Sequence, residues 1–131
     1  YWTNGGPGGS GIQAGLLTEM GQVHVNDDSF PEDGDNSTGL KVFYNPYSWS
    51  QVANTIYVSQ PKGVGFSYCA DSVEEKDCIN NDQTSAQDAY DFFIAFFDAY
   101  PEFKTNDFYL TAESYGGICK IRPTLFFLYI R

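Results

Sequence analysis

The spacing of apolar residues predicts a helix between two short strands over residues 53–111. Ala53–Val58 is rich in β-branched and aromatic residues, which is typical of a strand. From Thr84 to Tyr100 apolar residues recur at helical spacing, and Pro101 should end that helix. These apolar residues are Ala86, Ala89, Tyr90, Phe93, Phe96 and Phe97. A second strand is predicted at Asp107–Thr111, so the pattern indicates an α/β fold with a mostly parallel sheet.

Two polar segments interrupt this pattern and are predicted to be loops. Asn4–Gly11 contains five glycines and one proline, so its backbone can approach another group closely. Asn26–Gly39 is acidic but lacks the closing Glu of a calcium loop, which favours a solvated excursion. Within it, Asn36 begins a sequon and is a candidate glycosylation site if the protein enters the secretory pathway.

The composition narrows the class of protein. The chain has 131 residues, 42% of them hydrophobic, which fits one small domain with a buried core. A formal net charge of −10 argues against binding to nucleic acid or to anionic membranes. The longest apolar run, Leu125–Ile130, is far shorter than a membrane span. The chain starts at Tyr1 without an initiator Met, so we expect the true N-terminus to be missing.

The few cysteines and the single histidine exclude the usual metal motifs. His24 is read as a surface histidine, and no Cys-x-x-Cys pair is present, so no metal or cofactor is expected. Cys69 and Cys78 are separated by eight residues. They could form a local disulfide in an oxidising compartment, or they could be two free thiols.

The strongest chemical signal follows the second predicted strand. Ser114 lies in Glu113–Gly117, where a tight strand-to-helix turn would expose its hydroxyl. Such a turn needs small residues two positions before and after the serine. Gly116 fits this pattern, whereas Ala112 replaces the usual glycine, so the motif alone is a weak indication of a nucleophile.

The glycine-rich loop supplies a second, independent signal. A nucleophilic serine needs backbone N–H groups that stabilise the oxyanion, one from the following residue and one from an earlier glycine-rich loop. Tyr115 and the loop around Gly6 occupy these positions. The same loop also matches a dinucleotide-binding spacing, but Pro7 lies inside it and the context of that motif is absent.

Five motifs in order resemble the serine carboxypeptidases, the family of cathepsin A and the vacuolar carboxypeptidases. The motifs are Trp2–Gly8, Gly15–Gly21, Asn45–Trp49, Gln60–Tyr68 and Glu113–Gly117. The resemblance implies a partial, incomplete α/β-hydrolase fold with a nucleophile elbow. Residues 1–118 would form the N-terminal part of that domain.

The same resemblance implies a role for each matching residue. Ser114 would be the nucleophile, and the N–H groups of Gly6 and Tyr115 would form the oxyanion hole. Positions that hold the substrate's C-terminal carboxylate correspond to Asn4, Gly5, Glu19 and Glu113. Two carboxyl groups that share a site cannot easily both ionise. A proton retained by this pair could donate to a substrate carboxylate, which predicts an enzyme that works best in acid.

Several positions depart from the family pattern. Gly9 and Gly11 stand where the family usually has Cys and Ser, so the disulfide from that Cys is absent or replaced. No His follows Ser114, although the triad Asp and His follow the nucleophile in this fold. Without a base the serine is a poor nucleophile, so we expect the 131-residue chain to be inactive.

Residues 119–131 break the resemblance. Cys119-Lys120 can be encoded by a sequence typical of an intron start, and an apolar, acid-free stretch follows. We therefore hypothesise that this tail is read-through of an unspliced intron or a frame error. The alternative is a real, buried helix after the elbow.

The resemblance predicts that the parent protein removes C-terminal residues from peptides or proteins through an acyl-enzyme. Two alternatives remain open, an acyltransferase of the same family and a non-catalytic binding module. The expected location is the secretory pathway, in a lysosome or vacuole or outside the cell.

Overall fold

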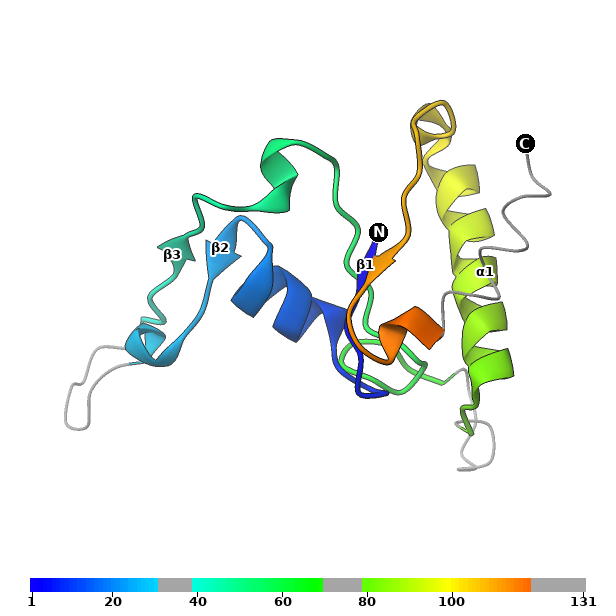
Figure 1. The fold of residues 1–131 in the computed structure, drawn as a ribbon, viewed down its shortest axis with the longest axis horizontal. Helices are drawn as coiled ribbons and strands as arrows, with labels where there is room; N and C mark the ends of the chain where they lie inside the picture. Colours follow the sequence, from blue (N-terminus) through cyan, green and yellow to red (C-terminus); the bar gives the residue numbers. More distant parts are fainter. Residues whose placement is uncertain (31–38, 70–78, 119–131) are drawn as a thin grey trace.

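The centre of the fold is a small parallel sheet. In the computed structural model, which describes residues 1–30, 39–69 and 79–118, β1 (Trp2–Thr3) pairs in parallel with β4 (Thr111–Ala112). Trp2 lies opposite Thr111 and Thr3 opposite Ala112. A single parallel bridge joins Trp2 to Tyr57 on the other side, so β1 is central (Figure 1). The predicted α/β class is confirmed.

Both predicted strands are shorter in the structure. Only Tyr57 of Ala53–Val58 forms a parallel bridge, and β4 starts at the last residue of the predicted Asp107–Thr111 strand. The physical reason is the length of β1, which turns into the glycine-rich loop at Asn4 and so offers only two residues for pairing. β-propensity alone cannot extend a strand without a partner.

Helix α1 (Asp82–Ala99) covers the sheet and supplies the apolar core. Asn81 caps its first turn, with its side chain accepting from the N–H groups of Gln83 and Thr84. A short 3₁₀ turn, η5 (Pro101–Phe103), follows the helix, because proline cannot continue it. Phe93 is only 1% exposed.

The environment of Phe93 shows how α1 is attached. Its ring makes edge-to-face contacts with Tyr1 at 4.8 Å and with Phe108 at 5.1 Å between ring centroids. Phe97 also packs edge-to-face on Phe108, at 5.2 Å. The predicted apolar face of the helix therefore lies against the residues that flank β1 and β4.

The segment between β1 and β2, which contains the Gly15–Gly21 motif, forms a helix that the apolar pattern did not predict. This helix, η1 (Gly11–Glu19), has π geometry, and the Met20 N–H donates to the Gly15 carbonyl five residues earlier at 2.8 Å. Ser10 caps its start by accepting from the Gln13 N–H at 3.1 Å. Glu19 is its last residue.

A second, antiparallel pair lies away from α1 (Figure 1). β2 (Val23–His24) pairs with β3 (Phe43–Tyr44), with Val23 opposite Tyr44 and His24 opposite Phe43. Two 3₁₀ turns belong to this region, η2 (Asp27–Ser29) and η3 (Trp49–Gln51). No helix in the described part of the chain is long and apolar enough to cross a membrane.

Several sequence predictions fall outside the described residues. These are the sequon at Asn36, the cysteine Cys78 and the tail at residues 119–131. Cys69 is described and is disulfide-bonded, so the alternative of a free thiol at this position is wrong. Its pairing with Cys78 stays a prediction.

Candidate active site

Ser114 lies on the tight turn that the motif predicts. It directly follows Glu113 after β4, and its φ of 50° places it in the left-handed region that non-glycine residues rarely adopt. The chain turns helical at once, with Gly116 N–H donating to the Glu113 carbonyl at 2.9 Å and Gly117 N–H to the Ser114 carbonyl at 3.0 Å. Ser114 is exposed. This is the geometry of a nucleophile elbow.

Ala112 fits at the position where the motif usually has glycine because the opposite position is glycine. A Cβ atom on Gly116 would lie 3.0 Å from the Ala112 Cβ and 3.0 Å from the Thr3 carbonyl oxygen. One methyl group therefore fills the space inside the turn, and a second one would not fit. The departure at Ala112 leaves the elbow intact.

The glycine-rich loop lies directly against the elbow. A Cβ atom on Gly5 would be 2.7 Å from the Ser114 Cβ and 2.8 Å from the Tyr115 nitrogen, so only glycine fits there. The Glu113 N–H donates to the Thr3 carbonyl at 3.2 Å, which holds the two segments in register. Gly6 follows with a φ of 122°, a conformation that favours glycine. The structure thus places Gly5, the residue before Gly6, directly against Ser114 and the Tyr115 nitrogen.

Three of the predicted carboxylate-binding residues form one hydrogen-bond cluster. The side-chain nitrogen of Asn4 donates to both Glu19 oxygens, at 3.1 and 2.9 Å, and to one Glu113 oxygen at 3.2 Å. Asn4 is buried, whereas both glutamates are exposed. Two carboxyl groups from distant parts of the chain therefore share one amide group, and Glu113 directly precedes Ser114.

Two supporting residues were missed from the sequence. The Trp2 indole N–H donates to the Asn4 side-chain oxygen at 3.0 Å, which fixes which end of the amide faces the glutamates. Gly15 allows this approach, because a Cβ atom there would lie 2.6 Å from Trp2 Cδ1. Both residues stand in the motifs that carry the family resemblance, but their roles depend on contacts that a linear sequence does not show.

Local contacts also explain the residues at Gly9, Gly11, His24 and Tyr115. A Cβ atom at Gly9 or Gly11 would collide with the carbonyl oxygen of Gly5 or Val58, so a side chain at either position would need the neighbouring backbone to shift. His24 is half-buried rather than fully on the surface, and its Nε2 lies 2.9 Å from the Glu19 carbonyl oxygen. The Tyr115 hydroxyl donates to Asp82 at 3.0 Å, joining the elbow to the first turn of α1.

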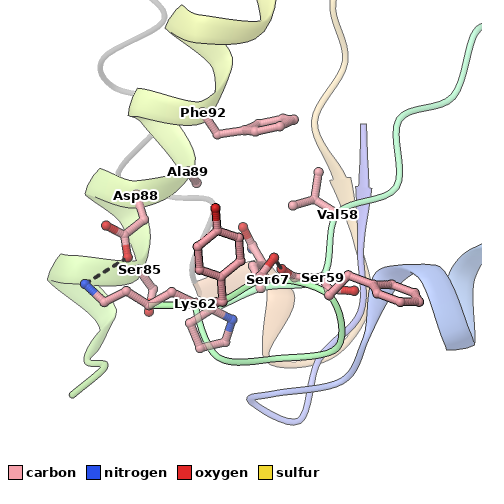
Figure 2. A pocket seen from close by; sticks show the side chains of 12 residues that line it. Val58, Ser59, Lys62, Ser67, Ser85, Asp88, Ala89 and Phe92 are labelled. Atoms are coloured by element: carbon pink, nitrogen blue, oxygen red, sulfur yellow. Dashed lines mark hydrogen bonds and ion pairs between the residues drawn. The ribbon is translucent and has the colours of Figure 1, made fainter. Parts of the chain in front are cut away.

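A cavity of about 370 Å³ lies elsewhere, between the loop after Val58 and α1. Figure 2 shows Lys62 and Asp88 at its rim and Phe92 above it, with the Lys62–Asp88 ion pair marked. None of the predicted catalytic or carboxylate-binding residues lines it. Among the residues that the structure describes, no cluster of three His, Cys, Asp or Glu side chains could hold a metal ion.

Comparison with known proteins identifies the family of the chain. The profile of the serine carboxypeptidase family matches residues 1–126, which includes the first part of the segment set apart as a tail. The chain is 41% identical to the lysosomal protective protein of Mus musculus over 117 residues, or 89% of this chain and 22% of that protein. It is 40% identical to carboxypeptidase Y of Komagataella phaffii over 116 residues, or 88% of this chain and 19% of that protein.

A solved structure shows the same arrangement of elements. The chain superimposes on a prohormone-processing carboxypeptidase from Saccharomyces cerevisiae with a TM-score of 0.79 and 27% identity, covering 98% of this chain and 25% of that one. The chain thus spans about a quarter or less of the length of its relatives, and its fold is part of an α/β-hydrolase. By its sequence motifs, its elbow and these matches, the chain belongs to the serine carboxypeptidase family.

Proposed function

We propose that the full-length protein is a serine carboxypeptidase that removes C-terminal residues from peptides or proteins. The observation that carries this proposal is the cluster of Glu19 and Glu113 on the Asn4 amide, next to Ser114. An exopeptidase of this type must recognise a free carboxylate at a fixed distance from the scissile bond. Hydrolysis at internal bonds would need no such group.

The reaction would proceed through an acyl-enzyme. The Ser114 oxygen attacks the carbonyl carbon of the last peptide bond, and its proton passes to a base. The N–H groups of Gly6 and Tyr115 stabilise the oxyanion. The C-terminal amino acid leaves with a proton on its nitrogen, and water then hydrolyses the ester to release the shortened peptide.

The base must come from outside residues 1–131, because no His follows Ser114 in this sequence. We therefore propose that the 131-residue chain alone is inactive and that the full-length protein supplies the triad Asp and His. Ser114, Gly6 and Tyr115 provide the nucleophile and the oxyanion donors only.

The glutamates would bind the substrate carboxylate together with Asn4 and the backbone at Gly5. The Asn4 side-chain nitrogen holds the two carboxyl groups together, at 3.1 and 2.9 Å from the Glu19 oxygens and 3.2 Å from one Glu113 oxygen.

The proposed compartment is the secretory pathway, with a lysosome, a vacuole or the cell exterior as destination. The disulfide at Cys69 supports this, because disulfides persist in oxidising compartments. A relative whose name places it in the lysosome is 41% identical to this chain. The proposed partners are peptide or protein C-termini, and the net charge of −10 disfavours nucleic acid and anionic membranes.

The test compares two substrates with the same blocked dipeptide sequence, one with a free C-terminal carboxylate and one amidated. We expect full-length wild type to hydrolyse the free acid, and Ser114→Ala to lose at least about a thousandfold in kcat. Equal rates on both substrates would contradict the carboxylate site. Products formed mainly by transfer to an added alcohol would favour an acyltransferase, and binding without turnover would favour a non-catalytic module.

A further inference from the structure

The segment Asn45–Trp49 is a motif whose role the proposed reaction does not explain. It makes a set of hydrogen bonds to the C-terminal end of η1, the helix that ends at Glu19. The Asn45 side-chain nitrogen donates to the Glu19 carbonyl at 3.3 Å and to the Gly21 carbonyl at 2.9 Å. The Ser48 hydroxyl donates to the Met20 carbonyl at 3.0 Å.

These bonds meet a specific physical need. The last carbonyl groups of a helix have no partner inside it, and burial without a partner costs free energy. Asn45 is 3% exposed and Ser48 is 5% exposed, so the side chains that supply the partners are themselves shielded from water. The Trp49 N–H adds a further bond to the Met20 carbonyl at 3.2 Å.

The orientation of the Asn45 amide is fixed independently. Its side-chain oxygen accepts from the Tyr47 N–H at 3.0 Å, so its nitrogen must face η1. The same Glu19 carbonyl lies 2.9 Å from His24 Nε2, and because a carbonyl oxygen can only accept, that nitrogen carries the proton. Two side chains therefore converge on the backbone of Glu19.

The segment also contacts the residue that orients Asn4, the amide shared by Glu19 and Glu113; these three residues are the carboxylate cluster. The Trp49 ring packs edge-to-face on the Trp2 ring, with 5.5 Å between centroids. Trp2 in turn donates to the Asn4 side-chain oxygen at 3.0 Å. The five-residue segment thus contacts Trp2, which orients Asn4, and the backbone carbonyl of Glu19.

We propose that Asn45 and Ser48 are positioning residues that set the Glu19 carboxyl on Asn4 for recognition of the substrate's C-terminal carboxylate. This inference rests on the proposed function. Neither side chain touches the cluster itself. They act by fixing the backbone from which the Glu19 side chain extends, and a misplacement of about 1 Å at such a group can cost a hundredfold in rate.

The sharpest variant is Asn45→Asp, because it keeps the oxygen that accepts from Tyr47 but replaces both donated bonds by repulsion between oxygens. Ser48→Ala removes the bond to the Met20 carbonyl and also the bond that the Ser48 hydroxyl accepts from the Ser50 N–H at 3.2 Å, and Ser48→Thr restores the hydroxyl. Ser50→Ala is the matched control, since the Ser50 hydroxyl bonds only to Thr55, at 2.9 Å, among the contacts that the structure describes. Each variant is made in the full-length protein.

We expect Asn45→Asp and Ser48→Ala to raise KM for the free-carboxylate dipeptide roughly tenfold, with kcat changed less than about threefold. Hydrolysis of an ester of the same acyl group with a small alcohol, which lacks the carboxylate, should be unchanged. Ser48→Thr and Ser50→Ala should behave as wild type. A KM that stays at the wild-type value in Asn45→Asp, or an equal loss on both substrates, overturns the inference.

The outcomes separate this inference from the proposed function. If wild type hydrolyses the peptide but the two variants do not change KM, only the positioning role is wrong. If wild type shows no turnover, the binding constant of a free-carboxylate peptide is measured in the same variants by calorimetry. Weaker binding in Asn45→Asp than in Ser50→Ala would then support the positioning role, and equal binding would overturn it.

Discussion

Among the described residues of the half that contains α1, β1 and β4, the buried hydrophobic side chains all come from α1. These are Ala86, Ala89 and Phe93. In the half that contains β2, β3 and η3, the buried side chains among the described residues are polar. These are Ser29, Asn45 and Ser48, while large apolar side chains such as Tyr47 and Val52 are exposed. The first half also buries polar side chains, among them Thr3, Asn4 and Ser85, so the two halves differ in the apolar core that α1 adds.

The difference matters because the two interactions do different things. Burial of apolar surface stabilises without a preferred direction, whereas a hydrogen bond fixes a distance and an angle. Asn4 follows β1 in the apolar half, and Glu19 is held at its backbone by the polar half. The carboxylate cluster thus joins an element anchored by packing to one anchored by hydrogen bonds.

The largest loss of stability is expected for a substitution of Phe93, in the apolar half. Phe93→Ala removes a ring that is 1% exposed and packed on Tyr1 and Phe108, so the free energy of unfolding should fall by about 3–5 kcal/mol. Ile94→Ala on the same helix is the control, because Ile94 is 38% exposed and should cost less than about 1 kcal/mol. Denaturant titration of the full-length protein measures both. Similar losses would show that α1 is not held by its apolar face.

A smaller effect is expected at Ser29 in the polar half. Its buried hydroxyl accepts from the Asn26 N–H at 2.9 Å, so Ser29→Ala leaves that donor without this partner and should cost about 1–3 kcal/mol. Asp28→Ala is matched, since Asp28 lies in the same turn with an exposed side chain. Hydrogen exchange around η2 should rise only in Ser29→Ala. An equal response to both substitutions would remove the argument that polar contacts hold this half.

The sequence predicted the apolar half well. Helical spacing placed a helix at residues 84–100, close to the observed Asp82–Ala99, and identified Phe93 as part of its apolar face. The elbow was predictable too, because a strained turn of this kind needs small residues at fixed positions around Ser114. These features depend on neighbours in the chain, so a linear pattern contains them.

The polar half was largely unpredictable for a physical reason. Ser48 bonds to a carbonyl 28 residues earlier, and Asn45 to one 26 residues earlier. Such bonds leave no periodic signal, and a backbone carbonyl has no side-chain identity. The π geometry of η1 and the contact of Trp2 with Asn4 were missed in the same way, whereas the family resemblance marked the motifs without explaining them.

The smallest change in the free energy of unfolding is expected for the ion pair at the rim of the cavity. This pair tests whether charge contributes to holding α1. Lys62 Nζ lies 3.5 Å from Asp88 Oδ2, and the two side chains are 31% and 41% exposed. Pairs with this much solvent contact are screened, so Lys62→Met and Asp88→Asn should each change the free energy of unfolding by less than about 1 kcal/mol. The effect should shrink further at high salt.

The double variant completes this test, because it isolates the pairwise coupling from the effect of each substitution. Lys62→Met leaves the Asp88 charge without its ion-pair partner, whereas Asp88→Asn removes that charge, so Asp88→Asn should cost no more than Lys62→Met. A coupling well above about 1 kcal/mol that persists at high salt would mean that α1 is held by charge as well as by Phe93. The contrast between an apolar half and a polar half would then have to be abandoned for this side of the helix.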